Sequence, residues 1–407
     1  MAVREVDPAT LPERMRSSPR VAVLIAAARG EEGKLWLVGG AVRDLLLGGD
    51  PKDLDVLVEG DALAAANRIA GRLGGEVEAT GRFDTATVRA PEVAFDLARA
   101  RTETYPRPGA LPEVAPATLA EDLPRRDFTV NALAAALAGQ RLGELRAPPG
   151  ALDDLRACIL RVFHPSSFRD DPTRLLRLAR LAGRLGFEPD ARTAALAREA
   201  IGAGALQTVS GPRLGTELRL LTRDPAALAG SRWAQQNDVL AALHPSLAFD
   251  EALSARALAL LPSPLVLLAS IARGFERREL RSWLDRLGFE AGDRDAIASA
   301  ALDAPALAVE LAAAGRPSEI AAAARGRPDA GVALAGALSA EGAARRWLER
   351  LRHVRLEIGG SDLIAAGVPE GPAIGRGLDA ALRAKLDGEA HGRDDELRAA
   401  LSARESS

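Results

Sequence analysis

The stretch LVGGAVRDLLLGGDPKDLDVLVEG, from Leu37 to Gly60, decides the fold expected for this chain of 407 residues. Apolar runs with strand character lie near both of its ends, in LWLVGG and in DLDVLV, and the segment AVRDLLLG between them has helical character. Two further runs, TATVRA and VAFDLA, predict strands, and ALAAANRIAGRLGG predicts a helix. Together these patterns predict a small α/β unit.

The rest of the chain predicts helices. From Asp171 onward the apolar periodicity is almost entirely helical, interrupted by Gly and Pro. Residues 106–124 carry five prolines, which predicts a loop or a loosely ordered flap. The Gly/Pro-rich stretch 355–375 is expected to separate a tail from the middle helices. The predicted fold class is therefore α+β, a small α/β domain followed by helices.

Composition narrows the function classes. The chain has 53 basic and 56 acidic residues, so its formal net charge of −3 argues against a general nucleic-acid coat but permits a local basic surface. The single cysteine, Cys158, excludes an intramolecular disulfide and a Cys-based zinc site. We expect a cytoplasmic protein, because neither a signal peptide nor an apolar run long enough to span a membrane is evident.

Asp53 and Asp55 lie two residues apart in a run with strand character, so we expect them to share one face of the strand while Leu54 and Val56 enter the core. Two ionised carboxylates this close repel each other, and Mg²⁺, which prefers one or two carboxylates plus substrate phosphates, relieves that repulsion. Asp96, in VAFDLA, offers a third catalytic carboxylate on a neighbouring strand. An isolated D-x-D is more often a solvated strand end.

A glycine turn precedes this acidic pair. Gly39 and Gly40 would let backbone N–H groups approach a triphosphate closely, and Arg43 follows within one helical turn. The turn lacks the patterns of a dinucleotide-binding fingerprint or a Walker A loop. Its position upstream of D-x-D favours a nucleotide site over a solvated strand end.

A second polar cluster lies in EDLPRRDFTVNALA, from Glu121 to Ala134. Arg125, Arg126 and Asp127 precede a run with helical character, and Asn131 lies four residues after Asp127. A charged helix start is the alternative interpretation.

The third cluster is FRDDPTRLLRLARLAGRLGF, from Phe168 to Phe187. Asp171 followed by a proline predicts a helix with Asp171 as its N-cap. Arginines then recur on one arc of this helix, at Arg174, Arg177, Arg180 and Arg184. A row of Arg is usually a solvated face. Residues 161–223, however, hold eleven Arg and no Lys against six acidic residues, which favours an anion-facing surface.

In order and spacing, these three clusters resemble the class II tRNA nucleotidyltransferase and bacterial poly(A) polymerase family over roughly residues 35–225. The pattern of residues 1–34 predicts a helical lead-in with a loop at residues 30–34. The resemblance implies a nucleotidyltransferase head (35–160), a helical neck (161–225), a helical body (226–354) and a tail (355–407). It also implies transfer of a nucleoside monophosphate from a nucleoside triphosphate to an RNA 3′ hydroxyl, with release of pyrophosphate.

The resemblance assigns roles to particular residues. Asp53 and Asp55 match the metal-binding pair. Gly40 and Arg43 match the family's triphosphate contacts, and either Arg125 or Arg126 matches its second-motif nucleotide contact. The neck residues that select and hold the nucleotide are matched by Asp171, Arg174, Arg177 and Arg180. Further nucleotide-binding candidates beside these positions are Gly39, Asp127 and Asn131. One position departs from the pattern, because Asp170 stands where the family often has Glu; the shorter side chain keeps the charge but reaches less far.

The base preference of such a site follows from hydrogen-bond chemistry. Cytosine and adenine both place an amino group beside an unprotonated ring nitrogen, so the Asp171 carboxylate can accept from the first and the Arg174 guanidinium can donate to the second. Uracil and guanine mismatch both contacts, and unpaired buried groups discriminate by several kcal/mol. The pair therefore selects CTP and ATP.

These arguments leave four products open. We expect CCA addition to the tRNA 3′ end, with addition of the final A alone as the nearest alternative, and addition of two Cs or of a poly(A) tail behind it. Proteins of other classes are a catalytically inactive RNA-binding protein on the same scaffold and a small-molecule nucleotidyltransferase. The intact acidic pair argues against the first, and the long helical region with its row of Arg argues against the second.

Overall fold

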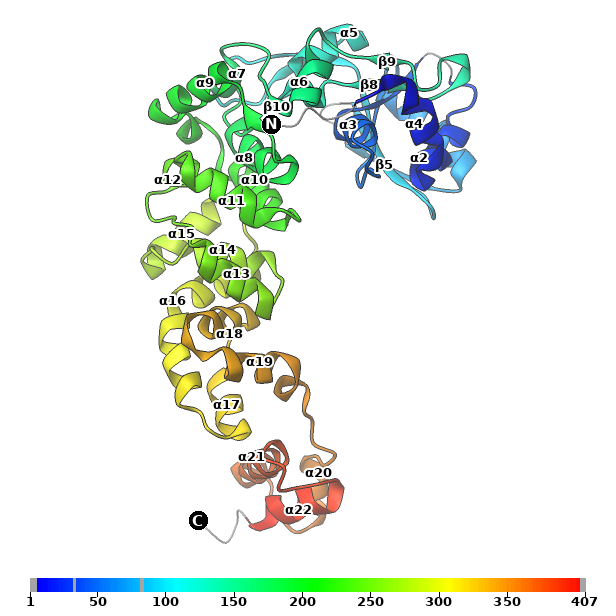
Figure 1. Ribbon diagram of the computed structural model, residues 1–407. Coiled ribbons are helices and arrows are strands. Elements are labelled where there is room, and N and C mark those ends of the chain that lie inside the picture. Colours follow the sequence, from blue (N-terminus) through cyan, green and yellow to red (C-terminus); the bar gives the residue numbers. More distant parts are fainter. Residues whose placement is uncertain (1–5, 32–33, 81–83, 403–407) are drawn as a thin grey trace. The chain divides into compact units, whose positions relative to one another are not determined.

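The computed structural model describes residues 6–31, 34–80 and 84–402 (Figure 1). Their contacts divide the chain into two compact units. The first holds the described residues up to Glu217 together with Gln236–Ala242, and the second holds Leu218–Gln235 and the described residues from Leu243 onward. The functional-site residues predicted from the sequence all belong to the first unit.

A mixed sheet organises the first unit. Within the described residues it has seven strands in the order β3-β4-β5-β2-β1-β8-β9. The strands are β1 (Leu35–Val38), β2 (Asp55–Val58), β3 (Glu76–Thr80), β4 (Thr85–Arg89), β5 (Ala94–Arg99), β8 (Ala134–Ala136) and β9 (Leu145–Arg146). The strands predicted from LWLVGG, DLDVLV, TATVRA and VAFDLA are confirmed as β1, β2, β4 and β5.

The central strands are buried on both faces, which explains their nearly continuous apolar sequence. All four residues of β1 are buried, and it pairs antiparallel with β2 and with β8. The register sets Val38 opposite Asp55, so the start of β2 lies beside the turn that follows β1. This register brings the acidic pair next to Gly39 and Gly40.

The first unit also contains helices, and the two that follow β1 and β2 along the chain contact strands of this sheet. Those of the first unit are α1 (Leu11–Ser17), α2 (Pro19–Ala27), α3 (Gly40–Leu46), α4 (Ala62–Leu73), α5 (Leu119–Asp122), α6 (Ala151–Ala157), α7 (Ser167–Asp170), α8 (Arg174–Leu185) and α9 (Ala191–Gly202). The helix α10 (Gly211–Arg223) begins in the first unit and ends in the second, and α12 (Val239–Leu243) lies mostly in the first. α4 shows why its sequence is helical: Asp61 caps its start by accepting from the Ala64 N–H, and Gly74, left-handed, ends it.

The proline-rich segment is more ordered than its composition suggests. β6 (Arg101–Thr104) and β7 (Glu113–Pro116) form an antiparallel hairpin, and α5 follows directly. The prediction of a loop over 106–124 is therefore wrong for β7 and α5. Pro116 ends the hairpin strand, a position where proline removes no interior ladder bond.

Shorter elements complete the first unit. They are the strands β10 (Ile159–Leu160) and β11 (Glu188–Pro189) and the 3₁₀ turns η1 (Pro8–Thr10), η2 (Leu123–Arg125), η3 (Thr129–Asn131), η4 (Gly139–Arg141) and η5 (Ala205–Thr208). The turn η3 replaces the helix predicted after Asp127. The loop predicted at residues 30–34 includes residues 32–33, which lie outside the described residues.

The second unit is helical, as its periodicity predicts. Its elements are α11 (Ala227–Gln236), α13 (Glu251–Leu260), α14 (Pro264–Ile271), α15 (Arg277–Arg286), α16 (Ala291–Ala313), α17 (Pro317–Ala324), α18 (Asp329–Ala335), the π-helix η6 (Gly336–Ala340), α19 (Glu341–Glu349), η7 (Leu351–His353), α20 (Gly360–Ala365), α21 (Pro372–Leu386) and α22 (Arg393–Ser402). The Gly/Pro-rich stretch 355–375 contains α20 and the start of α21, so it is less irregular than expected.

One helix corrects the expectation about apolar runs. α16 is long and apolar enough to cross a membrane by length and composition alone, with a mean hydropathy of 1.5 in its most apolar window. Its many alanines raise that value, and residues such as Ile297, Leu307 and Leu311 are buried against neighbouring helices that include α14 and α18. A core helix of this kind passes the same test as a membrane span.

Candidate active site

A cavity of about 430 Å³ in the first unit collects the residues singled out from the sequence. Thirteen of the fourteen predicted site residues line it: Gly39, Gly40, Arg43, Asp53, Asp55, Arg125, Arg126, Asp127, Asn131, Asp171, Arg174, Arg177 and Arg180. Only Asp96 is absent from its wall. Segments far apart in the sequence thus form one polar cavity of the size of small-molecule sites.

Glycine is needed at both positions of the turn, because arginine side chains lie close to its backbone. Gly39 has φ +71°, a left-handed conformation that favours glycine, and its N–H donates to the Leu133 carbonyl at 2.8 Å. A Cβ at Gly39 would lie 3.2 Å from a guanidinium nitrogen of Arg126, and one at Gly40 would lie 3.4 Å from Arg43. The two glycines therefore let two arginines approach the backbone closely.

The acidic pair lies at the start of β2. The strand begins at Asp55, so Asp53 comes just before it instead of within it, yet both carboxylates line the cavity. Leu54 and Val56 are buried, as the strand pattern predicts. In the described structure neither acidic side chain accepts a hydrogen bond.

The environment of Asp55 disfavours the ionised form of its carboxyl group. Burial in the cavity wall raises the pKa of this carboxyl, although the side chain is open to the cavity. Arg126 acts against that effect, whereas the carboxylates of Asp96 and Asp53 raise the pKa further. A cation at this position would offset the repulsion among these carboxylates.

Asp96 lies opposite Asp55 in the parallel pairing of β2 with β5. Its Oδ1 accepts from the Thr87 hydroxyl at 2.6 Å. Within the described residues, no cluster of three or more His, Cys, Asp or Glu side chains is close enough to hold a metal by itself. Metal binding here would therefore rest on two carboxylates and on ligands from the substrate.

A chain of hydrogen bonds runs from the glycine turn to α8. Buried Arg43 donates to Asn131 Oδ1 at 2.5 Å, and Asn131 donates to Asp127 Oδ1 at 3.1 Å. Asp127 Oδ2 then accepts two bonds from Arg177, at 2.9 and 2.7 Å. Burial alone would raise the pKa of Asp127, but the charge and hydrogen bonds of Arg177 hold it far below its usual range.

Several arginines line the cavity, and two carboxylates that the sequence analysis did not single out form ion pairs with them. Glu217, on α10, lies 3.5 Å from Arg177 and 3.9 Å from Arg180. Burial raises the pKa of Glu217, and these arginines oppose the rise. Asp44 pairs with Arg43 at 2.6 Å and with Arg184 at 3.6 Å.

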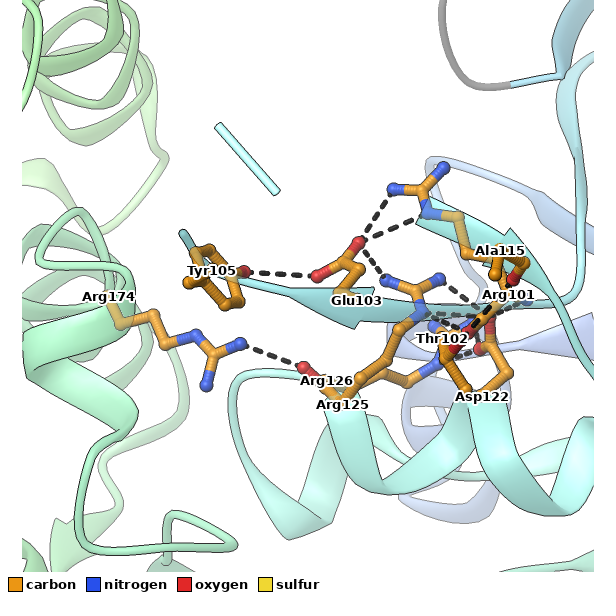
Figure 2. A network of polar contacts seen from close by, with 9 residues as sticks. All are labelled: Arg101, Thr102, Glu103, Tyr105, Ala115, Asp122, Arg125, Arg126 and Arg174. Carbon is orange, nitrogen blue, oxygen red and sulfur yellow. Dashed lines mark hydrogen bonds and ion pairs between the residues drawn. The ribbon is translucent and has the colours of Figure 1, made fainter. Parts of the chain in front are cut away.

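Asp122 organises the second cluster (Figure 2). This fully buried carboxylate accepts from Arg125 at 2.7 Å and from Arg126 at 3.0 Å, and also from the Arg101 backbone N–H. Arg125 reaches onward to Glu103 at 2.8 Å. No local pattern predicts this role, because an acidic residue before two arginines is common.

Glu103 joins the hairpin to this cluster. Its Oε1 accepts from Arg101 and Arg125, and its Oε2 accepts from the Tyr105 hydroxyl at 3.0 Å (Figure 2). Both Glu103 and Tyr105 line the cavity. Side chains of β6 and of Tyr105, which follows it, thus form part of the cavity wall, a contribution that residue type alone did not indicate.

The third cluster differs locally from its prediction. α8 begins at Arg174, and the residue capping it is Thr173, so the prediction of Asp171 as N-cap is wrong. Asp171 instead forms a turn in which its Oδ1 accepts from the Thr173 N–H at 3.2 Å and from the Thr173 hydroxyl at 2.6 Å. Pro172 and Thr173 form a turn between Asp171 and Arg174, the first residue of the helix.

Arg174 is buried, not solvated. Its guanidinium donates to Ser167 Oγ at 2.5 Å and to the Arg125 carbonyl at 2.8 Å (Figure 2), and it still lines the cavity. These bonds fix the plane of the guanidinium beside Asp171, the geometry that recognition of a flat base edge requires.

The sequence matches known proteins along most of its length. Residues 35–161 match the poly A polymerase head domain family. The chain is 35% identical over 384 residues to the CC-adding tRNA nucleotidyltransferase of Deinococcus radiodurans, covering 92% of this chain and 91% of the relative. It is 32% identical over 434 residues to the A-adding tRNA nucleotidyltransferase of Geobacter sulfurreducens, covering 98% of this chain but only 49% of the relative.

The fold has solved counterparts. The Thermotoga maritima CCA-adding enzyme complexed with tRNA superimposes with a TM-score of 0.74 at 27% identity, over 99% of this chain and 100% of that one. The chain spans about half the length, or less, of the A-adding relatives it matches. The fold class predicted from the sequence is confirmed.

Proposed function

Since this chain belongs to the tRNA nucleotidyltransferase family, we propose that it adds CMP and AMP, taken from CTP and ATP, to the 3′ end of tRNA. In this reaction the RNA 3′ hydroxyl oxygen bonds to the α-phosphorus, the bond to pyrophosphate breaks, and the hydroxyl proton passes to solvent. The observation that carries the proposal is the single cavity that holds an acidic pair, an arginine-rich wall and the pair Asp171 and Arg174.

We propose Asp53 and Asp55 as the residues that hold Mg²⁺. Their fit rests on donor chemistry, because both present carboxylate oxygens to the cavity and the pKa of Asp55 is raised by burial and by neighbouring carboxylates. When bound, the metal would stabilise negative charge on the attacking and leaving oxygens. Asp96 is a supporting carboxylate in this proposal, held by Thr87 behind Asp55.

The arginines of the cavity hold the triphosphate in this proposal. Arg126 is placed close to the Gly39 backbone, and Arg43 close to Gly40. Both are fixed by acidic partners, Arg126 by Asp122 and Arg43 by Asp44. Groups fixed in advance lose little freedom when the nucleotide binds, so they favour a single orientation of the reacting phosphate.

Base selection is assigned to Asp171 and Arg174. The carboxylate would accept from the amino group that cytosine and adenine share, and the guanidinium would donate to the adjacent ring nitrogen. Both side chains are already held by protein contacts. Uracil and guanine would leave these groups unpaired, which disfavours the incorporation of UTP and GTP by several kcal/mol.

The wider organisation stays part of the proposal. The head (35–160) would hold the reaction, the neck (161–225) would select the nucleotide and contact RNA, and the body (226–354) and tail (355–407) would hold the rest of the tRNA. Residues 403–407 of that tail and 1–5 and 32–33 of the lead-in lie outside the described residues. A cytoplasmic location is part of the same proposal.

The product is tested with three tRNA transcripts, ending before CCA, after the first C, and after both Cs. Each is incubated with CTP, ATP or both, and extension is measured at single-nucleotide resolution. Extension of the first transcript by three nucleotides supports CCA addition. Extension only of the last transcript, by one A, would identify an A-adding enzyme, and long A tracts would identify a poly(A) polymerase. Binding of tRNA without any extension would identify an inactive RNA-binding protein.

A further inference from the structure

Arg213 lies outside the cavity wall but contacts two of its parts. It is the third residue of α10 and is about one-quarter exposed. Its Nη2 donates to Asp171 Oδ1 at 2.7 Å, and its Nη1 donates to the Gly109 carbonyl at 2.7 Å and more weakly to that of Ala110 at 3.4 Å. One guanidinium thus joins the proposed base-selecting carboxylate to the loop between β6 and β7.

The bonds to Asp171 are unevenly distributed over its two oxygens. Oδ1 accepts all three: from Arg213, from the Thr173 N–H and from the Thr173 hydroxyl. Among the described residues, no hydrogen bond to Oδ2 is formed. A carboxylate fixed through one oxygen has a defined orientation, so its second oxygen remains available to accept from a base.

The loop end of this connection is also tightly fitted. Gly109 is buried and has φ +69°, and its N–H donates to the Asp170 carbonyl at 3.2 Å. A Cβ at this position would lie 2.2 Å from Thr208 Oγ1 and 2.7 Å from the Thr208 carbonyl oxygen. Only glycine permits this approach, so the loop position depends on Gly109 as well as on Arg213.

We propose that Arg213 is a specificity-determining positioning residue: it fixes Oδ1 of Asp171 against the β6–β7 loop and thereby directs Oδ2 toward the amino group of the incoming base. The inference rests on the proposed function and deepens it. Arginine is required because its planar fork reaches the carboxylate and the loop carbonyl at once, whereas lysine offers a single point charge. The nucleotide preference should therefore depend on the loop position as well as on Asp171.

Two variants test the two ends of the connection. Arg213→Lys keeps the charge but cannot bridge both acceptors. Gly109→Ala leaves Arg213 and Asp171 intact but displaces the loop from Thr208. The matched control is Gly74→Ala, because Gly74 has a similar φ of +63° but its added Cβ would meet nothing within 4 Å. All are compared with wild type by thermal unfolding before assay.

The measured quantity is the ratio of kcat/KM for CTP to that for UTP on a tRNA lacking CCA. Loss of folded enzyme lowers both rates equally and leaves this ratio unchanged. We expect both Arg213→Lys and Gly109→Ala to lower the ratio by about tenfold or more, the scale of one hydrogen bond to a charged group. Gly74→Ala should keep the wild-type ratio.

Three results would decide the matter. An unchanged ratio in Arg213→Lys, with wild-type extension normal, overturns the role of Arg213. A lowered ratio in Arg213→Lys but not in Gly109→Ala overturns the dependence on the loop. If the wild-type chain extends no tRNA, the proposed function itself fails. Should Gly109→Ala not fold, Arg213→Lys alone decides the proposal, because its CTP-to-UTP ratio is measured independently of the loop variant.

Discussion

The carboxylates at the two ends of the cavity differ in their hydrogen bonds and in the direction of their pKa shifts. At the start of β2, Asp53 and Asp55 accept no hydrogen bond within the described structure, and burial together with the neighbouring carboxylates of Asp96 and Asp53 raises the pKa of Asp55. On the side of α8, Asp127 accepts from a backbone N–H, from Asn131 and twice from Arg177, and its pKa is held far below its usual value. The carboxylates at one end thus have no hydrogen-bonded cationic partner within the described structure, and the carboxylate at the other end is already neutralised.

This difference indicates which end needs a ligand. An unbalanced acidic pair is unfavourable in the free protein and becomes favourable when a cation and a triphosphate arrive. A neutralised network gains little from a ligand but keeps its side chains in place. The acidic end is therefore suited to the reaction, and the arginine end to holding and selecting the nucleotide.

The largest expected effect comes from substituting either residue of the acidic pair. Asp55→Ala or Asp53→Ala should lower nucleotide transfer by about 10²–10³-fold or more, the scale for losing one preorganised charge-stabilising group. Protein stability should stay close to wild type, because each substitution relieves repulsion.

Glu78→Gln is the control for these variants, since Glu78 is a carboxylate of the same sheet that is 74% exposed. Transfer is measured with excess enzyme and tRNA ending in CC. Near-normal transfer by Asp55→Ala would contradict the assignment of the pair as metal ligands.

Removing the carboxylate at the neutralised end should mainly lower the free energy of unfolding. Asp127→Ala leaves Arg177 without its closest partner; because Asp127 is buried but Arg177 is 38% exposed, we expect a loss of about 1–3 kcal/mol of unfolding free energy. Asp153→Ala is the control, because Asp153 pairs with Arg156 while 81% exposed, and such pairs contribute at most about 1 kcal/mol. Urea unfolding measures both, and equal losses would show that Asp127 is not a structural anchor.

The pH dependence separates the two ends further. Because the folded-state pKa of Asp127 is lowered, its stabilisation is complete above the unfolded pKa of about 3.9 and is lost as the pH falls below it. The difference in unfolding free energy between wild type and Asp127→Asn should therefore shrink from pH 5 toward pH 2. A difference that stays constant over this range would contradict the assigned pKa direction.

The sequence predicted those features whose partners are close along the chain. Gly39, Gly40 and the acidic pair lie within one strand–helix–strand unit, so spacing alone placed them in one site. Asp122, Glu103 and Arg213 were missed because their roles depend on distant segments, such as the 42 residues that separate Arg213 from Asp171. The N-cap prediction at Asp171 failed for a local reason, since Pro172 and Thr173 form a turn before α8.

The most direct test of the proposed division compares Asp171→Ala with Asp55→Ala on tRNA ending in CC. Single-turnover rates are measured with ATP and with GTP, and the ATP-to-GTP ratio is the readout. We expect Asp55→Ala to lower both rates by a similar factor, and Asp171→Ala to lower the ratio by about tenfold or more, because it removes the acceptor for the adenine amino group. A wild-type ratio in Asp171→Ala would contradict the assignment of base selection to this end of the cavity.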